Sequence, residues 1–291
     1  MTLDPDFCRS LMFLPADNER FRNSALRGSA DIIILDLEDA IPASKKDRVR
    51  DGIQSAIHDI AEANRICAVR INSGLRLLGK DLEAVICPGL SALTIPKVPS
   101  AELLKMIDET VSDLESERDI PVGNIRLIAQ IETATGLQNI NDIARSTPRL
   151  AAIGIGSEDL AADLGSQAEK EILYYPSMQV LIAARSAGIV PLGYLGSITV
   201  YNETDTYRGW IQQARKFGFE GAFCIHPRQV EILNEEFLPS ADEVAEAETL
   251  IKAFEAHKEK GIGAFTVDDR MVDAPVIDRA RRILKRNHNR R

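Results

Sequence analysis

Eight short apolar runs recur along the sequence, and this repetition limits the possible folds more than any other feature. Each run is almost continuously hydrophobic, which is typical of strands that are buried on both faces. Segments compatible with helices lie between the runs, such as residues 100–117 and 177–186. Eight strands alternating with helices predict a (β/α)8 barrel, with an open doubly wound sheet as the alternative. The runs are residues 10–15, 31–38, 66–72, 92–97, 125–131, 150–156, 189–196 and 221–227.

The length and composition of the chain are those of one large globular domain. Its 291 residues suit one barrel better than two mid-sized domains. Charged residues make up 27% and hydrophobic residues 45%, as in ordinary water-soluble proteins. The net charge of −9 argues against a nucleic-acid-binding protein, whose surface would be basic. A small anionic substrate remains possible, because a few arginines can make a single site positive.

Cysteine usage and the lack of long apolar segments predict a cytoplasmic protein. The cysteines form no C-x-x-C pair and two of them lie in strand-like runs, so we expect free, buried thiols in a reducing compartment. The first ten residues lack a signal-peptide pattern, and no apolar run approaches the roughly 20 residues that span a bilayer. We therefore expect no membrane partner. The cysteines are Cys8, Cys67, Cys87 and Cys224.

The chain continues past the eighth run, and this extension is more than a barrel needs. Residues 240–260 predict an amphipathic helix, and Ser240 three residues before Glu243 resembles a capping box. A glycine-containing extended segment follows, and then a last helix from about Pro275. We expect a barrel over residues 1–238 and, within the same domain unit, an extension over residues 239–291. The extension would act as a lid on its own barrel or on that of a neighbouring subunit.

Two acidic residues follow neighbouring apolar runs, where barrel enzymes build their active sites. Glu132 follows the run IRLIAQI, and Asp159 follows the run LAAIGIG. Because the carboxyl ends of parallel strands meet at one face, we expect these carboxylates to lie close together. Two carboxylate oxygens suit Mg²⁺, which takes its remaining ligands from water and substrate. The alternatives are structural ion pairs or helix capping.

Arg70 ends the third apolar run, where a charged side chain needs a partner. Its planar guanidinium suits bidentate capture of a substrate carboxylate, and the alternative is a structural ion pair with an acid of the core. Glu38 and Asp39 end the second run. They would either orient water on the metal ion or pair with Lys45 and Lys46.

Two further strand-end residues allow competing interpretations. Lys97 ends the fourth run and could form a Schiff base, as in a class I aldolase, although pairing with a nearby carboxylate is the more common role of such a lysine. His226 precedes a proline at the end of the eighth run. It could act as a base, or it could fix a loop and line a pocket.

An ordered set of motifs resembles the citrate lyase β-subunit-like proteins of the HpcH/HpaI aldolase superfamily, which include the malyl-CoA and citramalyl-CoA lyases. The resemblance extends from about Arg9 to about Leu284, nearly the whole chain. It implies a TIM barrel in which Glu132 and Asp159 bind Mg²⁺ and Arg70 holds the carboxylate of a 2-oxo acid. The motifs are RSLMFLPADNERF, DIIILDLEDA, AVRIN, TIPK, IETATG, GIGSEDLAADLG and CIHPRQ.

The resemblance also assigns roles near the two ends of the chain. In the CoA-dependent lyases a C-terminal Asp enters the site of a neighbouring subunit as the acid/base, and the matching stretch DDRMVDAP makes Asp273 the candidate. Arg9 would contact the CoA substrate beside the mouth of the barrel. The resemblance further implies a homo-oligomer, either a trimer or a hexamer.

The expected function is that of an oxo-acid lyase. With Mg²⁺ as cofactor it would cleave or form a 3-hydroxyacyl-CoA, such as malyl-, citramalyl- or citryl-CoA, with an acyl-CoA and a 2-oxo acid as the other partners of the reaction. One alternative is a malyl-CoA thioesterase. A second is the β subunit of a multi-protein citrate lyase, acting on a thioester of an acyl carrier protein. A class I aldolase based on Lys97 and a non-catalytic binder of 2-oxo acids are further alternatives.

Overall fold

The computed structural model describes residues 8–258, 265–267 and 270–288. The chain divides into two compact units, Met1–Glu235 and Glu236–Arg291. The first unit contains the eight predicted strands, and the second contains two long helices with a short strand pair. Within the described residues no helix combines the length and the apolar character needed to cross a membrane.

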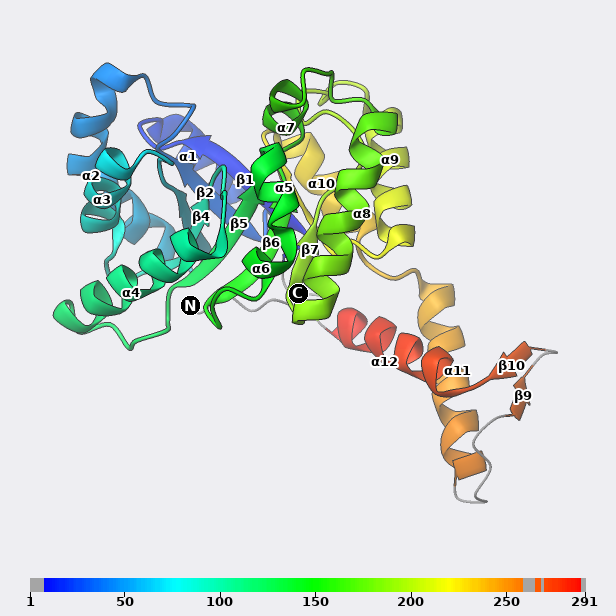
Figure 1. The fold of residues 1–291 in the computed structure, drawn as a ribbon. Helices are drawn as coiled ribbons and strands as arrows, with labels where there is room; N and C mark the ends of the chain where they lie inside the picture. The colour runs from blue at the N-terminus through cyan, green and yellow to red at the C-terminus, as the bar shows by residue number, and fades with distance from the viewer. Residues whose placement is uncertain (1–7, 259–264, 268–269, 289–291) are drawn as a thin grey trace. The chain divides into compact units, whose positions relative to one another are not determined.

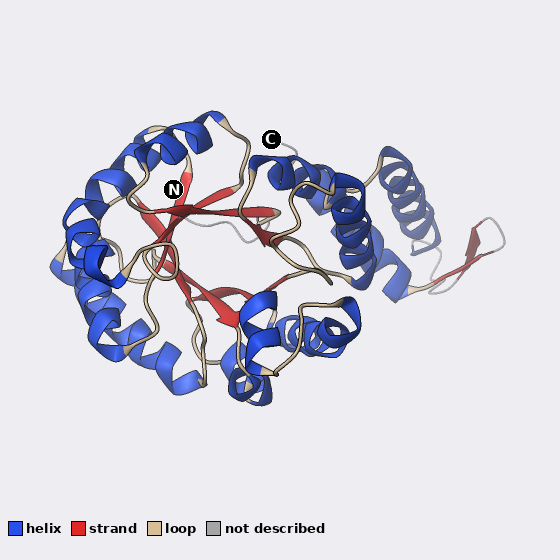
Figure 2. Cartoon of the chain, turned by 90° about the horizontal axis from the view of Figure 1, so that it is seen from above, coloured by secondary structure: helices blue, strands red, loops and turns tan. Residues whose placement is uncertain are grey.

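Eight parallel strands form the inner wall of the first unit, and helices surround them (Figures 1 and 2). The sheet runs in the order β7-β6-β5-β4-β3-β2-β1-β8. Its two ends meet where Leu192 pairs with Gly221 and the N–H of Gly193 donates to the carbonyl of Gly221 at 2.9 Å. The predicted barrel is therefore confirmed, and the open sheet is excluded. The strands are β1 Ser10–Pro15, β2 Ile32–Asp36, β3 Ile66–Arg70, β4 Leu90–Ile95, β5 Arg126–Ile131, β6 Leu150–Ile155, β7 Val190–Leu192 and β8 Ala222–Cys224.

The connections between strands are helical. Helix α4, which covers the predicted segment 100–117, and helix α8, which includes the segment 177–186, agree with their sequence patterns. The helices are α1 Glu19–Arg27, α2 Lys46–Glu62, α3 Leu75–Val85, α4 Ala101–Glu117, α5 Ala134–Gln138, α6 Ile140–Ala144, α7 Ser157–Asp163, α8 Lys170–Ala187, α9 Thr204–Phe217 and α10 Pro227–Glu236, with a short 3-10 turn η2 at Ala43–Lys45.

Side chains that point into the barrel alternate along each strand and change from apolar to polar toward the carboxyl end. The interior core includes Ile128 of β5 and Ala68 of β3. Because side chains on one face recur every two residues, Gln130 and Glu132 follow Ile128 on the same face, and Arg70 follows Ala68. The strand period therefore brings charged groups to the top of an otherwise apolar interior.

Gly221 allows the barrel to close. A Cβ atom at this position would lie 1.5 Å from the carbonyl oxygen of Cys8, in the segment that leads into β1. The N–H of Ala222 donates to the carbonyl of Arg9 at 2.9 Å, so the two backbones are in direct contact. Only a residue without a side chain permits this approach between β8 and β1.

The C-terminal unit pairs helix α11, Ala241–Lys258, with helix α12, Ala274–His288 (Figure 1). The predicted capping box is confirmed, since the N–H of Ser240 donates to Glu243 and the N–H of Glu243 donates back to the Ser240 hydroxyl. Strands β9, Phe265–Val267, and β10, Arg270–Val272, form an antiparallel pair. Residues 259–260, at the end of the predicted helix, and residues 261–264 and 268–269, in the predicted extended segment, lie outside the described residues. A small core joins α11 to the chain around α12, with Val272, Ile277, Leu250, Ala253, Phe254 and Val276.

Candidate active site

A cavity of about 790 Å³ lies among the residues at the carboxyl ends of the barrel strands. One part of its lining is polar and comes from β2, β3 and β5, from the loops that follow β2 and β5, and from the first turn of α7. Another part is apolar and includes Phe13, Ile198 and Phe223. The polar residues that line it include Asp36, Asp39, Arg70, Gln130, Glu132 and Asp159. Three of the predicted site residues, Arg70, Glu132 and Asp159, therefore share one cavity.

Glu132 is a buried carboxylate that receives hydrogen bonds but forms no ion pair within the described part of the chain. Only 2% of the residue is exposed. Its Oε1 accepts a hydrogen bond from Nε2 of Gln130 at 3.0 Å, and its Oε2 accepts one from the backbone N–H of Lys97 at 2.8 Å. Burial, together with the nearby charges of Glu38 and Asp159, raises the pKa of Glu132 to about 7. A positive ion at this position would relieve both effects.

The turn after β6 leaves room for the Glu132 side chain. A Cβ atom on Gly156 would lie 2.3 Å from Oε1 of Glu132, so a glycine is required for this packing. Three residues later, Asp159 lies in the first turn of α7 with a half-exposed side chain. Neither acid caps a helix. Thr133 caps α5 by accepting from the N–H of Gly136 at 3.1 Å, and α7 begins without a side-chain cap.

Arg70 forms the structural ion pair that was one of its two predicted alternatives, and its capture of a substrate carboxylate remains a prediction. It pairs with a core acid, since its Nε and Nη2 donate to the two carboxylate oxygens of Asp36 at 2.7 and 2.6 Å. Its guanidinium also lies over the ring of Phe13, 4.6 Å from the centroid. Nη1 lies 3.2 Å from Glu38 without the geometry of a hydrogen bond. The N–H groups of Nη1 therefore remain available for a ligand carboxylate, while Asp36 fixes the orientation of the fork.

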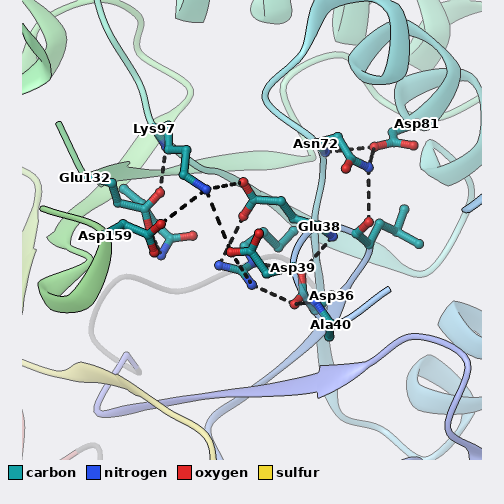
Figure 3. Close-up of polar contacts among 12 residues, drawn as sticks. Asp36, Glu38, Asp39, Ala40, Asn72, Asp81, Lys97, Glu132 and Asp159 are labelled. Atoms are coloured by element: carbon teal, nitrogen blue, oxygen red, sulfur yellow. Dashed lines mark hydrogen bonds and ion pairs between the residues drawn. The ribbon is translucent and has the colours of Figure 1, made fainter. Parts of the chain in front are cut away.

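Lys97 lies among the acids of the site (Figure 3). Its ammonium group is 2.9 Å from Glu38, 3.4 Å from Asp159 and 3.8 Å from Asp39. Burial alone would lower the pKa of Lys97, but these carboxylates raise it above its usual range. An ammonium that stays protonated is not a nucleophile, so these contacts favour the pairing role of Lys97 over Schiff-base chemistry.

The expectation that Glu38 and Asp39 could pair with Lys45 and Lys46 is not met. The side chain of Glu38 instead faces Lys97 and Arg70. The ammonium of Lys46 donates to the backbone carbonyls of Leu37 and Glu38 at 2.8 and 2.7 Å, and to the side chain of Asn72. Lys46 therefore holds the chain that carries Glu38 without touching its carboxylate.

The donor set fits a divalent cation. Five carboxylates lie around the polar part of the cavity, and Arg70 and Lys97 pair with four of them but not with Glu132. The five belong to Asp36, Glu38, Asp39, Glu132 and Asp159. The ionised set carries a negative excess, and carboxylate oxygens are the side-chain ligands that Mg²⁺ prefers. Among the described residues no three His, Cys, Asp or Glu side chains group as a metal cluster. An ion at Glu132 and Asp159 would complete its shell with water or substrate.

Comparison with known proteins agrees with this geometry. Residues 9–227 match the HpcH/HpaI aldolase/citrate lyase family. The chain belongs to this family. It is 31% identical over 280 residues to citrate lyase subunit beta of Leuconostoc mesenteroides subsp. cremoris, covering 95% of this chain and 92% of the relative. The resemblance inferred from the motifs is therefore confirmed.

Two other relatives of this HpcH/HpaI family member differ in their named activities and ligands. It is 34% identical over 282 residues to a (3S)-malyl-CoA thioesterase of Cereibacter sphaeroides (strain ATCC 17029 / ATH 2.4.9), covering 95% of this chain and 93% of the relative. The crystal structure of CitE from Mycobacterium tuberculosis, in complex with magnesium, acetoacetate and coenzyme A, superposes with a TM-score of 0.76 at 26% identity. That match covers 98% of this chain and 100% of the other.

The structure corrects the expected position of Arg9 in this family member. Arg9 precedes β1, at the opposite end of the barrel from the polar residues of the cavity. Its guanidinium binds both carboxylate oxygens of Asp31, at 2.8 and 2.7 Å, and donates to the carbonyl of Asn234. The placement beside the mouth was wrong because Arg9 precedes its strand and therefore lies at the amino end of the barrel. Its predicted contact with the CoA substrate remains a prediction.

Asp273 lies in the C-terminal unit and has a local structural role. Its carbonyl accepts a hydrogen bond from the N–H of Ile277, and its Oδ1 accepts one from the N–H of Val276 at 3.4 Å. Asp273 therefore precedes and caps α12, which leaves the second carboxylate oxygen for other contacts. Its predicted role as acid/base remains a prediction.

Sequence reasoning missed three residues of the site. Asp36 anchors Arg70, Phe13 lies against the guanidinium, and Gln130 binds Glu132. A signal was present for Gln130, because it lies two residues before Glu132 on a buried strand and so shares its face. A signal was also present for Asp36, because it is an acidic residue near the end of an apolar run.

Proposed function

We propose that this protein is an Mg²⁺-dependent carbon–carbon lyase that cleaves or forms a 3-hydroxyacyl-CoA, with an acyl-CoA and a 2-oxo acid on the other side of the reaction. Malyl-, citramalyl- and citryl-CoA are the candidate thioesters. The observation that carries the proposal is the buried carboxylate of Glu132, which forms no ion pair with any described residue and lies near Asp159 in a cavity that Arg70 also lines. The CitE complex with magnesium, acetoacetate and coenzyme A supports the same choice of ligands.

Each residue of the cavity has a part in this proposal. Glu132 and Asp159 would hold the metal ion, which when bound supplies Lewis-acid stabilisation of negative charge on oxygen. Arg70 binds the carboxylate of the 2-oxo or 2-hydroxy acid through Nη1, in the orientation that Asp36 imposes. Lys97 keeps Asp159 in place. The apolar lining excludes water from the reacting atoms.

Proton transfer to and from the α carbon of the acyl thioester is assigned to Asp273 of a neighbouring subunit. In the cleavage direction a carboxylate of the cavity removes the proton of the ligand hydroxyl, and the bond between the α carbon and the carbinol carbon breaks as the carbonyl of the 2-oxo acid forms. The electron pair stays with the acyl thioester as an enolate, and Asp273 protonates its α carbon. In the condensation direction Asp273 removes the same proton. General acid/base catalysis of this kind contributes about 10²–10⁴ in rate.

The test is a product analysis with purified protein, Mg²⁺ and the three candidate thioesters. A lyase releases a 2-oxo acid, which is trapped as its phenylhydrazone, and leaves the thioester bond of the acyl-CoA intact. We expect the 2-oxo acid to form from at least one thioester and to disappear with EDTA. Absence of any 2-oxo acid from all three, with Mg²⁺ present, contradicts the proposal.

The 34% identity to a (3S)-malyl-CoA thioesterase favours a second candidate function. In that case water cleaves the thioester after or instead of the carbon–carbon step. Free thiol from malyl-CoA, measured with a disulfide reagent, distinguishes this outcome because a lyase alone releases none. A thiol signal that matches or exceeds the 2-oxo acid would assign the protein to the thioesterases.

The 31% identity to citrate lyase subunit beta raises the question of the thioester carrier. We infer that the protein works as a homo-oligomer, a trimer or hexamer, on free acyl-CoA in the cytoplasm. The four cysteines are buried and form no disulfide, as expected in a reducing compartment. Turnover of citryl thioesters of acyl carrier protein, without turnover of the CoA esters, would identify a citrate lyase subunit instead. Light scattering coupled to gel filtration measures the oligomer.

A further inference from the structure

Gln130 is a buried polar side chain of which one half has no partner among the described residues. It lies on β5, is 2% exposed, and lines the cavity. Its Nε2 donates to Oε1 of Glu132 at 3.0 Å. Its Oε1 is buried and has no hydrogen-bond partner in the described part of the chain. Such an orphaned acceptor is unfavourable unless a ligand or a water molecule supplies the missing donor.

The orientation of this amide follows from its contact with Glu132. The NH₂ group of Gln130 faces Glu132, since Nε2 is the atom that donates to Oε1 of Glu132 at 3.0 Å. The amide oxygen is then the group left for a donor from elsewhere. Neither Arg70 nor Lys97 supplies it, since Oε1 has no hydrogen-bond partner among the described residues.

The two kinds of ligand expected in this cavity differ in what they can offer to an acceptor. A 2-oxo acid carries a carbonyl on the carbon next to its carboxylate and has no donor there. The 3-hydroxyacyl thioester carries a hydroxyl on the same carbon. In the proposed binding mode Arg70 would hold the carboxylate next to this carbon and Glu132 would hold the ion. Gln130 lines the same cavity and adjoins Glu132.

We propose that Oε1 of Gln130 accepts a hydrogen bond from the hydroxyl of the 3-hydroxyacyl thioester, and so makes Gln130 a specificity residue that favours the hydroxylated ligand over the 2-oxo acid. The inference rests on the proposed function. The amide of Gln130 would then have two functions. Its nitrogen orients the carboxylate of Glu132, and its oxygen distinguishes a ligand hydroxyl from a ligand carbonyl.

The experiment compares two small ligands that differ only at this carbon. Pyruvate and each enantiomer of lactate are titrated by calorimetry into the full-length protein with saturating Mg²⁺. For Gln130→Met, which keeps the length of the side chain but removes its acceptor, we expect the ratio of lactate Kd to pyruvate Kd to rise about 10-fold for one enantiomer. Gln130→Glu restores an acceptor oxygen and should return the ratio to within about 3-fold of wild type.

Two controls separate recognition from general damage. Gln54→Met makes the same change on α2, where Gln54 binds the carbonyl of Ala84, and should leave both affinities unchanged. A second experiment uses the wild-type protein and needs no variant of Gln130. In the wild-type protein, 2-methoxypropionate keeps the oxygen but lacks the O–H donor, and should bind about 10-fold more weakly than lactate. This experiment keeps the proposal testable if Gln130→Met does not fold.

The outcomes distinguish this inference from the proposed function. Equal weakening of lactate and pyruvate in Gln130→Met would show that Gln130 acts only through Glu132, and would overturn the inference. Equal binding of lactate and 2-methoxypropionate by the wild type would also overturn it, with Mg²⁺-dependent pyruvate binding intact. Failure of the wild type to bind pyruvate with Mg²⁺ would instead overturn the proposed function on which the inference depends.

Discussion

At the scale of single residues, Glu132 lies in an environment that is unfavourable for its charge unless a cation is bound. The carboxylate of Glu132 is buried beside other acids, and its two hydrogen bonds do not compensate for this environment, as the raised pKa shows. Arg70 is also buried, but Asp36 and the ring of Phe13 satisfy it. Arg70 therefore has partners for its charge, whereas Glu132 forms no ion pair with a described residue. A buried acid with a raised pKa is typical of a functional site that binds a ligand.

Glu132→Gln should stabilise the metal-free protein at alkaline pH. The folded pKa of about 7 lies above the usual value of 4.5, so between these values the folded protein binds the proton more tightly than the unfolded chain does. The contribution of Glu132 to the stability of the wild type is therefore most favourable below about pH 4.5, falls as the pH rises toward 7, and then stays level. The loss is about 3 kcal/mol, which the variant avoids because its amide carries no charge.

Urea unfolding in EDTA at pH 5 and pH 8 measures this effect. Fluorescence of the single tryptophan, Trp210 on α9, reports the unfolding of the barrel. We expect the variant to exceed the wild type mainly at pH 8, and excess Mg²⁺ to stabilise only the wild type. A variant no more stable than the wild type at pH 8 would mean that the carboxylate is not strained.

Arg70→Lys should separate ligand binding from metal binding. A lysine ammonium keeps the charge but cannot bind Asp36 and a ligand carboxylate at once with the geometry of the guanidinium fork. We expect the affinity for pyruvate to fall about 10-fold or more and the affinity for Mg²⁺ to stay near that of the wild type. Arg76→Lys, on the exposed side of α3, is the matched control. Unchanged pyruvate binding would remove Arg70 from the substrate site.

At the scale of secondary-structure elements, the strand period and the turns after the strands build the site. Residues Ile128, Gln130 and Glu132 point to the barrel interior in sequence, so β5 alone provides a core residue, an amide and a metal ligand. The turn from β6 into α7 then places Asp159 near Glu132. The backbone of Gly156 has ordinary angles, with φ −94° and ψ 98°, so the need for glycine comes from the space occupied by Glu132.

Gly156→Ala should therefore displace Glu132 without unfolding the barrel. The new methyl group would collide with the end of a flexible side chain, and the backbone itself tolerates alanine. We expect a loss of about 10-fold or more in Mg²⁺ affinity by calorimetry with little change in the far-UV circular dichroism spectrum. Gly209→Ala on α9, where a Cβ meets nothing within 4 Å, is the control and should bind Mg²⁺ normally. Normal binding by Gly156→Ala would contradict the assignment of Glu132.

At the scale of the whole molecule, the chain combines a closed barrel with a separate C-terminal unit. The barrel contains the proposed metal and carboxylate sites, whereas the proposed acid/base, Asp273, belongs to the other unit. The predicted extension over residues 239–291, docked on a neighbouring subunit, would bring the two together in an oligomer. Complementation between inactive variants can test this arrangement without any structure of the assembly.

Mixing Glu132→Gln with Asp273→Asn should restore activity if the lid acts between subunits. Each variant alone lacks one essential group, but in mixed oligomers an intact barrel can meet an intact Asp273 from its neighbour, at up to about a quarter of the sites. The oligomers are dissociated, mixed and reassembled before turnover is measured. Asp273→Asn alone should still bind Mg²⁺ and pyruvate. Formation of mixed oligomers without restored turnover would contradict a lid shared between subunits.

Much of the fold could be predicted from the sequence because continuous apolar runs encode strands buried on both faces. All eight runs contain a strand, although β7 and β8 have three residues each where the runs predicted eight and seven. The chain leaves the sheet at Gly193, whose φ of +153° few other residues adopt, and α10 begins at Pro227. Apolar residues of the later part of these runs line the cavity instead, as Ile225 does.

The sequence by itself determined that the barrel would form and that Arg70, Glu132 and Asp159 would meet, because parallel strands end at one face whatever their detailed packing. Only the tertiary structure decided the partners: Arg70 with Asp36, Lys97 with Glu38 and Asp159, and Arg9 with Asp31. These partners are at least 22 residues apart in sequence, and each pairing depends on strand register and side-chain rotamer, which no local pattern encodes.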